Sequence, residues 1–307
     1  MSVKLFIDGE AGTTGLQIRE RLAGRRGLSV LEIDPDRRKD IDARRRLLDE
    51  ADIAILCLPD EAARQSVELV GDGDTRIIDA SSAHRVAEGW TYGFPELSAE
   101  QARAIATARR VANPGCWPQG AIALLRPLVN AGLIPADHPV TVHGVSGYSG
   151  GGRRMIADYE GGERRPGPWL PYALGLEHKH LPELRRHAAL STRPLFVPAV
   201  GDFAQGMTVV VPLHLGSLDE VPGRARLHAA LADHYASLPG GVVEVAALDE
   251  GAGGVPSPDA HAGTDRMRLH VFGNDAAAQA VLIASYDNLG KGAAGAAVQN
   301  LELMLGA

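Results

Sequence analysis

Cys116 lies in a stretch of sequence that suits a reactive thiol. Residues 113–120 read Asn-Pro-Gly-Cys-Trp-Pro-Gln-Gly, between a predicted strand and a predicted helix. The proline and glycine before the cysteine favour a tight turn, and Pro118 suits the first turn of a helix, where no amide donor is lost. Amide groups and the helix dipole at such a corner lower a thiol pKa and can stabilise an oxyanion. We therefore expect Cys116 to be a nucleophile, although a free cysteine is ordinarily a small buried hydrophobe.

A thiolate nucleophile needs a partner for proton transfer, which is usually histidine. Residues 177–184 read Glu-His-Lys-His-Leu-Pro-Glu-Leu, so His178 and His180 stand at the predicted start of a helix. The other nine of the 11 histidines are not in so dense a polar cluster. A His-x-His pair can also bind a metal. Because Lys179 stands between the two and no further ligand cluster is obvious, we rank a metal site below proton transfer and expect no metal.

A glycine-rich turn near the N-terminus predicts a dinucleotide site. Residues 9–15 read Gly-Glu-Ala-Gly-Thr-Thr-Gly and connect a predicted strand to a predicted helix. Glycines let the backbone turn sharply and approach a pyrophosphate, whose charge is favoured at a helix N-terminus. The spacing differs from the commoner Gly-x-Gly-x-x-Gly pattern, so a glycine-rich turn without a ligand is the alternative. The predicted binding residues are Gly9, Gly12, Thr13, Thr14 and Gly15.

The end of the second predicted strand carries both signals for cofactor choice. A carboxylate such as Asp34 commonly holds the ribose 2′-hydroxyl of NAD, whereas nearby arginines accept the 2′-phosphate of NADP. Arg37, Arg38 and Lys39 are three consecutive cations. Since charge-assisted bonds to phosphate are strong, they favour NADP. A solvated basic turn balanced by its own aspartates is the competing interpretation.

The first 112 residues alternate short apolar runs with helical stretches. Continuously apolar strands separated by helices are typical of a parallel sheet that is covered on both faces. The predicted strands are 4–7, 29–33, 53–58, 76–78 and 109–112, and the predicted helices are 14–23, 62–69 and 99–107.

The pattern changes after Cys116. Long strands with few helices between them indicate a mixed or antiparallel sheet, and hence an α+β domain. A helix at about 119–129 precedes strands near 140–144, 195–198, 208–215, 242–245 and 268–272, and the stretches 278–289 and 293–305 are predicted to be helical. We expect the last of these to return to the first domain.

Composition restricts the class of protein. The 307 residues carry a net charge of −7, which does not suggest binding to nucleic acid or to an anionic membrane. Two cysteines fit a reducing compartment, and Cys57, inside the apolar run 53–58, is expected to be structural. We see no signal peptide, and no apolar run reaches the roughly 18 residues of a membrane-spanning helix. We expect a cytoplasmic protein whose partners are small molecules and copies of itself.

Several motifs in order resemble the N-acetyl-γ-glutamyl-phosphate reductase family, and in particular its shorter branch. Besides the cysteine and histidine motifs, residues 79–85 read Asp-Ala-Ser-Ser-Ala-His-Arg, and 92–96 read Tyr-Gly-Phe-Pro-Glu. Residues 146–153 read Ser-Gly-Tyr-Ser-Gly-Gly-Gly-Arg, and 287–295 read Asp-Asn-Leu-Gly-Lys-Gly-Ala-Ala-Gly. Trp117 and Gln119 depart from the family, which more often has a smaller aromatic residue and a threonine there.

The resemblance implies an α/β fold with a Rossmann dinucleotide-binding domain and an α+β catalytic and oligomerisation domain, as in glyceraldehyde-phosphate and semialdehyde dehydrogenases. The first domain would comprise residues 1–112 and about 285–307, and the second 113–284. It also implies a homodimer or homotetramer and the NADPH-dependent reduction of N-acetyl-γ-glutamyl phosphate, in arginine biosynthesis, to the γ-semialdehyde and inorganic phosphate.

The resemblance also assigns roles to residues. Cys116 would be the nucleophile that forms a thioester, and His180 the acid/base. Ser81 and Asn288 would join the cofactor site, with Gly292 nearby. The substrate would be held by Arg85, Asn113, Ser146, Gly147, Arg153 and His178.

Three alternatives remain open. A sibling reductase would act on aspartyl phosphate or aminoadipyl phosphate through the same cysteine and histidine. A non-catalytic protein would use the same fold to sense dinucleotides. A metal hydrolase would be built on His178 and His180.

Overall fold

The computed structural model describes residues 2–161, 166–238, 240–248, 250 and 256–306. The chain forms two compact units. Unit 1 contains the residues up to Pro95, Glu100–Gly115 and the residues from Ala293 onwards, whereas unit 2 contains Glu96–Ala99 and Cys116–Gly292. In the described part of the chain, no helix is long and apolar enough to cross a membrane.

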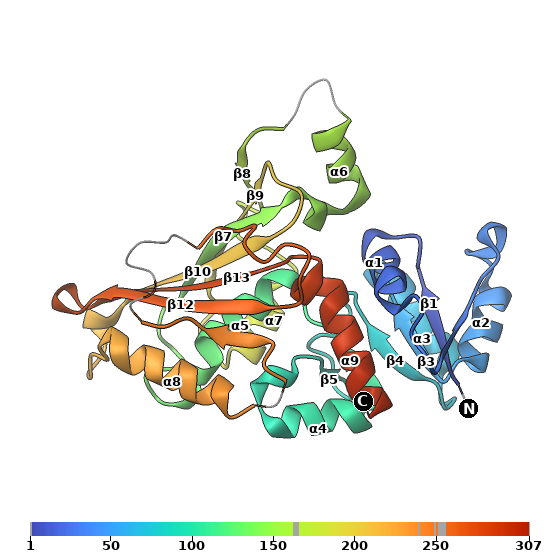
Figure 1. The fold of residues 1–307 in the computed structure, drawn as a ribbon, viewed down its shortest axis with the longest axis horizontal. Helices are drawn as coiled ribbons and strands as arrows, with labels where there is room; N and C mark the ends of the chain where they lie inside the picture. The colour runs from blue at the N-terminus through green and yellow to red at the C-terminus, as the bar shows by residue number, and fades with distance from the viewer. Residues whose placement is uncertain (1, 162–165, 239, 249, 251–255, 307) are drawn as a thin grey trace. The chain divides into compact units, whose positions relative to one another are not determined.

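Unit 1 is built on a parallel sheet of six strands in the order β2-β1-β3-β4-β6-β5 (Figure 1). This arrangement confirms the parallel α/β domain that the sequence predicts. The strands are β1 (Val3–Asp8), β2 (Leu28–Leu31), β3 (Ile53–Leu56), β4 (Arg76–Asp79), β5 (Thr91–Tyr92) and β6 (Arg110–Ala112).

Helices cover both faces of this sheet, because successive strand residues point to opposite sides. Leu5 and Ile55 belong to one core cluster, together with residues of α1 and α9, whereas Phe6 and Leu56 belong to a second cluster with residues of α2 and α3. The C-terminal helix is therefore part of the unit 1 core. The helices are α1 (Thr13–Leu22), α2 (Ile41–Glu50), α3 (Asp60–Val70), α4 (Ala99–Thr107) and α9 (Gly295–Leu305).

Helix α2 is absent from the sequence prediction. Its residues include three consecutive arginines, which hide the apolar periodicity of a helix. Two features account for it. Asp40 caps its N-terminus by accepting hydrogen bonds from the amides of Asp42 and Ala43, and Leu48 packs into the unit 1 core.

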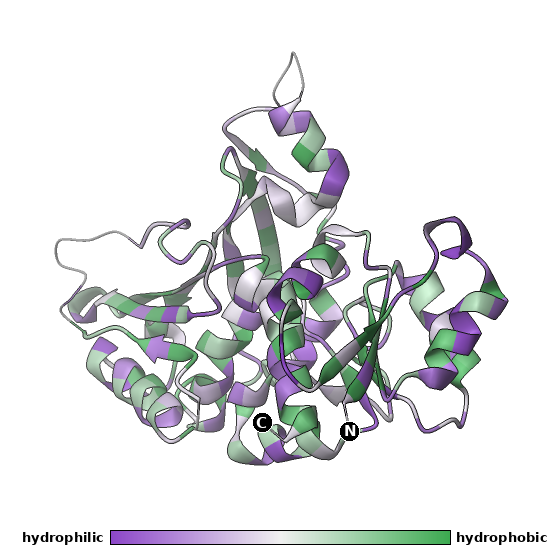
Figure 2. Cartoon of the chain, turned by 45° about the vertical axis from the view of Figure 1, so that its right-hand side comes forward, coloured by the Kyte–Doolittle hydropathy of each residue, from purple (hydrophilic) through white to green (hydrophobic). Residues whose placement is uncertain are grey.

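Unit 2 contains a mixed sheet of seven strands in the order β11-β12-β13-β10-β7-β9-β8. Four strand pairs are antiparallel and two, β7/β9 and β11/β12, are parallel, which confirms the predicted α+β domain. Figure 2 shows hydrophobic residues along these strands. The strands are β7 (Thr141–Gly147), β8 (Trp169–Pro171), β9 (Leu195–Gly201), β10 (Met207–His214), β11 (Val243–Val245), β12 (Met267–Asn274) and β13 (Gln279–Tyr286).

Two long helices pack against this sheet. Helix α5 contacts β10 and β13, and α8 contacts β11 and β12. The helices of unit 2 are α5 (Cys116–Asn130), α6 (Gly152–Glu160), α7 (Leu181–His187) and α8 (Arg224–Ala236). Of these, α6 and α8 were not expected from the sequence.

The helix predicted at 278–289 is wrong, because most of this stretch is strand β13. Its alanines suggested a helix, but the burial alternates as in a strand: Ala280, Leu282 and Ala284 are buried, whereas Val281 and Ile283 are partly exposed. Strand β13 lies between β10 and β12, where pairing on both sides overrides a weak helical propensity.

Candidate active site

Cys116 is the first residue of helix α5, at the corner that the sequence predicts. Tyr286 supports this corner from the end of β13. Its hydroxyl donates a hydrogen bond to the carbonyl oxygen of Cys116 at 2.5 Å and accepts one from the amide of Gly120 at 3.1 Å. A Cβ atom at Gly120 would lie only 2.7 Å from the Tyr286 hydroxyl, so the contact requires glycine. The thiol itself is partly exposed.

A pocket of about 320 Å³ brings the predicted nucleophile and both histidines together within unit 2. The rings of His178 and His180 lie 4.7 Å apart between centroids. The pocket is lined by Cys116, Trp117, Ser146, Gly147, Gly150, Gly151, Met155, Tyr172, His178, Lys179, His180 and Val200. Three residues of the substrate prediction, Arg85, Asn113 and Arg153, are not in this lining, and neither is Asn288, which was predicted for the cofactor site.

The surroundings of His178 determine its protonation state. Burial, with a further contribution from the charge of Lys179, lowers the pKa of His178 to about 4. The Nδ1 atom of His178 accepts a hydrogen bond from the amide of His180 at 3.1 Å. His178 is therefore neutral at pH 7, with its proton on Nε2, where it can donate to a bound group. His180 is 6% exposed and occupies the N-cap position of α7, where its side chain makes no capping hydrogen bond.

Asn288 holds the glycine-rich loop that follows β7. Its carboxamide oxygen accepts a hydrogen bond from the amide of Gly206 at 2.8 Å, and its nitrogen donates to the hydroxyl of Ser149 at 3.0 Å. Asn288 is 1% exposed. In this structure its side chain thus supports the loop directly after Ser146 and Gly147, the last two residues of β7, both of which line the pocket.

The glycine turn of unit 1 has the shape that a pyrophosphate requires. Gly9 has φ +88°, and a Cβ atom there would lie 2.4 Å from the carbonyl oxygen of Cys57. A Cβ atom at Gly15 would lie 2.6 Å from the Cα of Glu10. Gly12 is the N-cap of α1, which starts at Thr13 and continues through Thr14. The glycines thus let the turn pack closely on itself and against Cys57, and a tight turn at a helix N-terminus fits the pyrophosphate of a dinucleotide.

The charged residues after β2 are largely engaged with one another. Asp34 accepts a hydrogen bond from the amide of Asp36, and Arg37 forms an ion pair with Asp40 at 2.6 Å. Arg38 lies 3.8 Å from Glu10, a residue of the glycine turn. Arginine and carboxylate groups therefore surround the place where the adenosine ribose of a dinucleotide binds in this fold.

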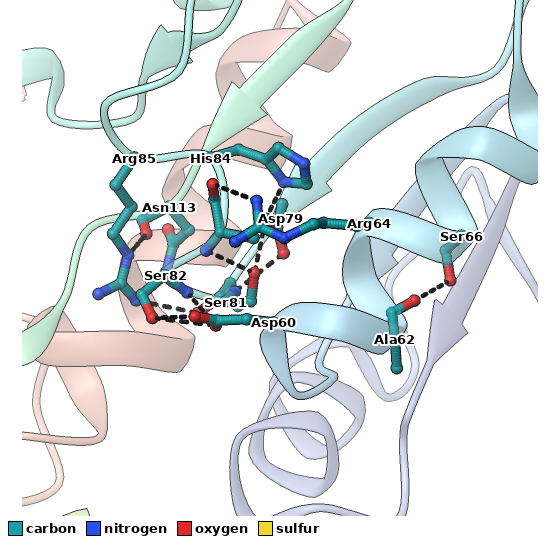
Figure 3. A network of polar contacts seen from close by, with 12 residues as sticks. Asp60, Ala62, Arg64, Ser66, Asp79, Ser81, Ser82, His84, Arg85 and Asn113 are labelled. Carbon is teal, nitrogen blue, oxygen red and sulfur yellow. Dashed lines mark hydrogen bonds and ion pairs between the residues drawn. The ribbon is translucent and has the colours of Figure 1, made fainter. Parts of the chain in front are cut away.

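A buried network of polar side chains lies at the ends of β4 and β6 (Figure 3). Asp79 is fully buried, accepts hydrogen bonds from the amide and hydroxyl of Ser81, and lies 2.6 Å from Nδ1 of His84. Arg85 donates to the carbonyl oxygens of Asn113 and Ala80. The Asn113 carboxamide donates to the carbonyl oxygen of Ala293 and accepts from Asn300. Ser81, Arg85 and Asn113 thus lie in one network of unit 1. Each of them makes hydrogen bonds that stabilise the loops after β4 and β6.

Sequence reasoning did not assign several residues that the structure places at the site. Tyr172, Met155, Lys179 and Val200 line the pocket without having been predicted to do so. Arg153, by contrast, is exposed on α6. Trp117 gave a signal because it departs from the family pattern, and Lys179 lies within the histidine motif, whereas Tyr172, Met155 and Val200 belong to no motif. Gln119, the other departure, is fully buried, and within the described residues neither polar atom of its carboxamide has a hydrogen-bond partner.

Comparison with known proteins agrees with this geometry. The model of the semialdehyde dehydrogenase NAD-binding domain matches residues 9–105, and that of the semialdehyde dehydrogenase dimerisation domain matches 116–288. N-acetyl-gamma-glutamyl-phosphate reductases from Mesorhizobium japonicum and Chelativorans sp. are 61% and 62% identical, over 100% and 99% of both chains. The fold is similar to that of aspartate semialdehyde dehydrogenase II from Vibrio cholerae, with a TM-score of 0.76, 16% identity and 99% coverage of each chain.

Proposed function

The chain belongs to the N-acetyl-gamma-glutamyl-phosphate reductase family of oxidoreductases, and on this premise we propose that it reduces N-acetyl-γ-glutamyl phosphate to the γ-semialdehyde and inorganic phosphate, a step of arginine biosynthesis. One observation carries the proposal: Cys116, at the start of a helix, shares a pocket with His178 and His180. An acyl-phosphate reductase needs a thiol nucleophile and an imidazole in that relation.

The chemistry follows from the thiol. The Cys116 sulfur attacks the acyl carbon, the bond from that carbon to the phosphate oxygen breaks, and a thioester remains on the enzyme. A bound nicotinamide cofactor supplies the hydride that reduces the thioester. The thiohemiacetal then collapses, its carbon–sulfur bond breaks, and the aldehyde leaves with the thiolate restored. His180 accepts the proton of the Cys116 thiol and exchanges the proton of the thiohemiacetal hydroxyl. Neutral His178 donates a hydrogen bond from Nε2 to the substrate.

The cofactor in this proposal is NADP(H). The glycine turn Gly9–Gly15 would hold the pyrophosphate, with Thr13 and Thr14 at the helix N-terminus. Arg37 and Arg38 are exposed, so their guanidinium groups can turn to a 2′-phosphate. Asp34 would remain the cap of the turn that presents them.

The oligomer in this proposal forms through the face of the unit 2 sheet opposite to α5. Val210, Ile283 and His270 lie side by side across β10, β13 and β12 and are partly exposed. Apolar side chains on a partly exposed sheet face, such as Val210 and Ile283, are typical of a contact with another subunit. The match of residues 116–288 to a dimerisation domain supports a second copy of the chain as that subunit. We further propose that the enzyme works in the cytoplasm.

The test is the reverse reaction, with N-acetylglutamate γ-semialdehyde, phosphate and either NADP or NAD. Phosphate-dependent formation of NADPH is the expected result. Activity with NAD alone would correct the cofactor, and activity with aspartate semialdehyde alone would assign the chain to a sibling reductase. If no semialdehyde reacts, dinucleotide sensing becomes the better interpretation.

A further inference from the structure

We propose that Tyr172 is a further catalytic residue, whose hydroxyl donates a hydrogen bond to the substrate oxygen that becomes negative during thioester formation and reduction, and that Trp117 is the residue that positions it. The inference rests on the proposed function of Cys116. It assigns a role to a residue that has no motif of its own and to one that departs from the family pattern.

The Tyr172 hydroxyl has a fixed orientation. The indole Nε1 of Trp117 donates a hydrogen bond to its oxygen at 2.9 Å. Trp117 is itself held in place, because it is 2% exposed and packs edge-on against Phe196 with 5.5 Å between the ring centroids. An indole N–H can only donate, so the hydroxyl oxygen must accept. The hydroxyl proton of Tyr172 is consequently directed away from Trp117.

Tyr172 and Cys116 line the same pocket. Burial, with the charge of Cys116 as the next contribution, raises the pKa of Tyr172 far above its usual value. The phenol thus keeps its proton over the whole range in which the enzyme can work and remains a hydrogen-bond donor. Trp117 follows Cys116 in the first turn of α5, so nucleophile and positioning residue share one helix terminus.

The reaction creates a need for such a donor. When the sulfur adds to the acyl carbon, the carbonyl oxygen gains negative charge, and it loses this charge as phosphate leaves. The same oxygen becomes negative again when the thioester is reduced. A donor fixed before the reaction stabilises both states without reorganisation. No proton is transferred from Tyr172, so His180 keeps the acid/base role.

The decisive variant is Tyr172→Phe, which removes the hydroxyl and keeps the ring. Removal of one oxyanion donor lowers kcat by about 10²-fold in comparable sites, and we expect this loss with little change in the KM for the aldehyde. Tyr159→Phe is the matched control, because Tyr159 also loses one hydrogen bond, to Gly167, but does not line the pocket. An unchanged kcat in Tyr172→Phe would overturn the proposal.

Trp117→Phe tests the positioning role and remains informative if the first variant does not fold. It keeps an aromatic ring against Phe196 but removes the N–H donor, so kcat should fall by about three- to tenfold, as for one lost hydrogen bond. In the Tyr172→Phe background the same change should have no further effect on kcat. Equal losses in both backgrounds would show that Trp117 acts through packing alone.

Alkylation of Cys116 separates this proposal from the proposed function. The pH midpoint of iodoacetamide labelling should be the same in wild type and Tyr172→Phe, because the hydroxyl acts on the substrate oxygen and not on the sulfur. A shifted midpoint would overturn the oxyanion role. A wild type that reduces no acyl phosphate and oxidises no semialdehyde would instead refute the proposed function.

Discussion

At the scale of single residues, the two cysteines have different environments, although both residues are partly exposed. Cys116 begins a helix and lines a pocket, whereas Cys57 follows a buried strand, and burial raises the pKa of its thiol to about 12. The negative charges of Asp79 and Asp8 raise this pKa further. A thiol in that state is a poor nucleophile at neutral pH. The surroundings of the two sulfur atoms therefore indicate which cysteine is the nucleophile without any comparison to other proteins.

The first prediction concerns the nucleophile. Cys116→Ser should lower kcat by more than about 10³-fold, because a serine hydroxyl stays protonated at neutral pH and is a much weaker nucleophile than a thiolate. Cys57→Ala should retain activity close to that of wild type. Initial rates of the phosphate-dependent reverse reaction measure both. Near-normal turnover in Cys116→Ser would refute the thioester mechanism.

The second prediction concerns His178 and pH. Its pKa is about 4 in the folded protein, below the ordinary 6.5, so the unfolded state binds the proton more readily. The stability linked to this group is complete above about pH 6.5 and is lost as the pH falls towards 4, at most by about 1.4 kcal/mol per pH unit. His178→Gln should flatten that part of the profile, as measured by urea unfolding at several pH values. Exposed His214, changed to Gln, is the control, and an equal flattening there would contradict the assignment.

At the scale of elements, the glycine turn is supported by a buried ion pair. Asp8 ends β1, and Arg44 of α2 donates to it at 2.9 Å while both side chains are buried. The hydroxyl of Ser66, on α3, donates to the same carboxylate at 2.9 Å. Strand, turn and two helices are therefore fixed together directly before Gly9. Helix α2, which the sequence prediction missed, has this as its structural role.

The third prediction follows from that network. Arg44→Met should lower the free energy of unfolding by about 3–5 kcal/mol, because it leaves the Asp8 carboxylate buried without its partner. Adding Asp8→Asn should restore part of the loss. Chemical denaturation measures the stability of both variants. If the single variant is as stable as wild type, the ion pair does not hold the turn.

The fourth prediction concerns the turn itself. Gly9→Ala should weaken dinucleotide binding at least about tenfold, because its Cβ atom would meet the Cys57 carbonyl oxygen at 2.4 Å and the turn must move. Gly24→Ala is a matched control, since Gly24 also has a positive φ but has nothing within 4 Å of its Cβ position. Fluorescence titration with NADPH compares the two. Equal effects would mean that backbone strain alone, and not the close approach, is responsible.

At the scale of the whole molecule, the two units divide the work. Unit 1 contains the glycine turn, and unit 2 contains the thiol, both histidines and the open sheet face. The fifth prediction is that Ile283→Arg disrupts subunit contact, because it would place a charge between Val210 and His270 on the sheet face proposed to form that contact. Light scattering after gel filtration should show a smaller species, whereas Gln279→Arg, at the exposed end of β13, should not. An unchanged mass for Ile283→Arg would place the contact elsewhere.

The sequence by itself determined the parallel α/β unit, the α+β unit and the helix corner at Cys116, because these depend on local periodicity, turn residues and capping. It also identified the two histidines as a pair. Tertiary structure alone decided that 278–289 is mainly a central strand, since pairing on both sides overrides propensity there. Only the tertiary structure shows that Tyr172 lies beside Trp117, 55 positions away, and that Arg44 forms an ion pair with Asp8. Contacts at such separations depend on how elements pack, and no local pattern of residues encodes them.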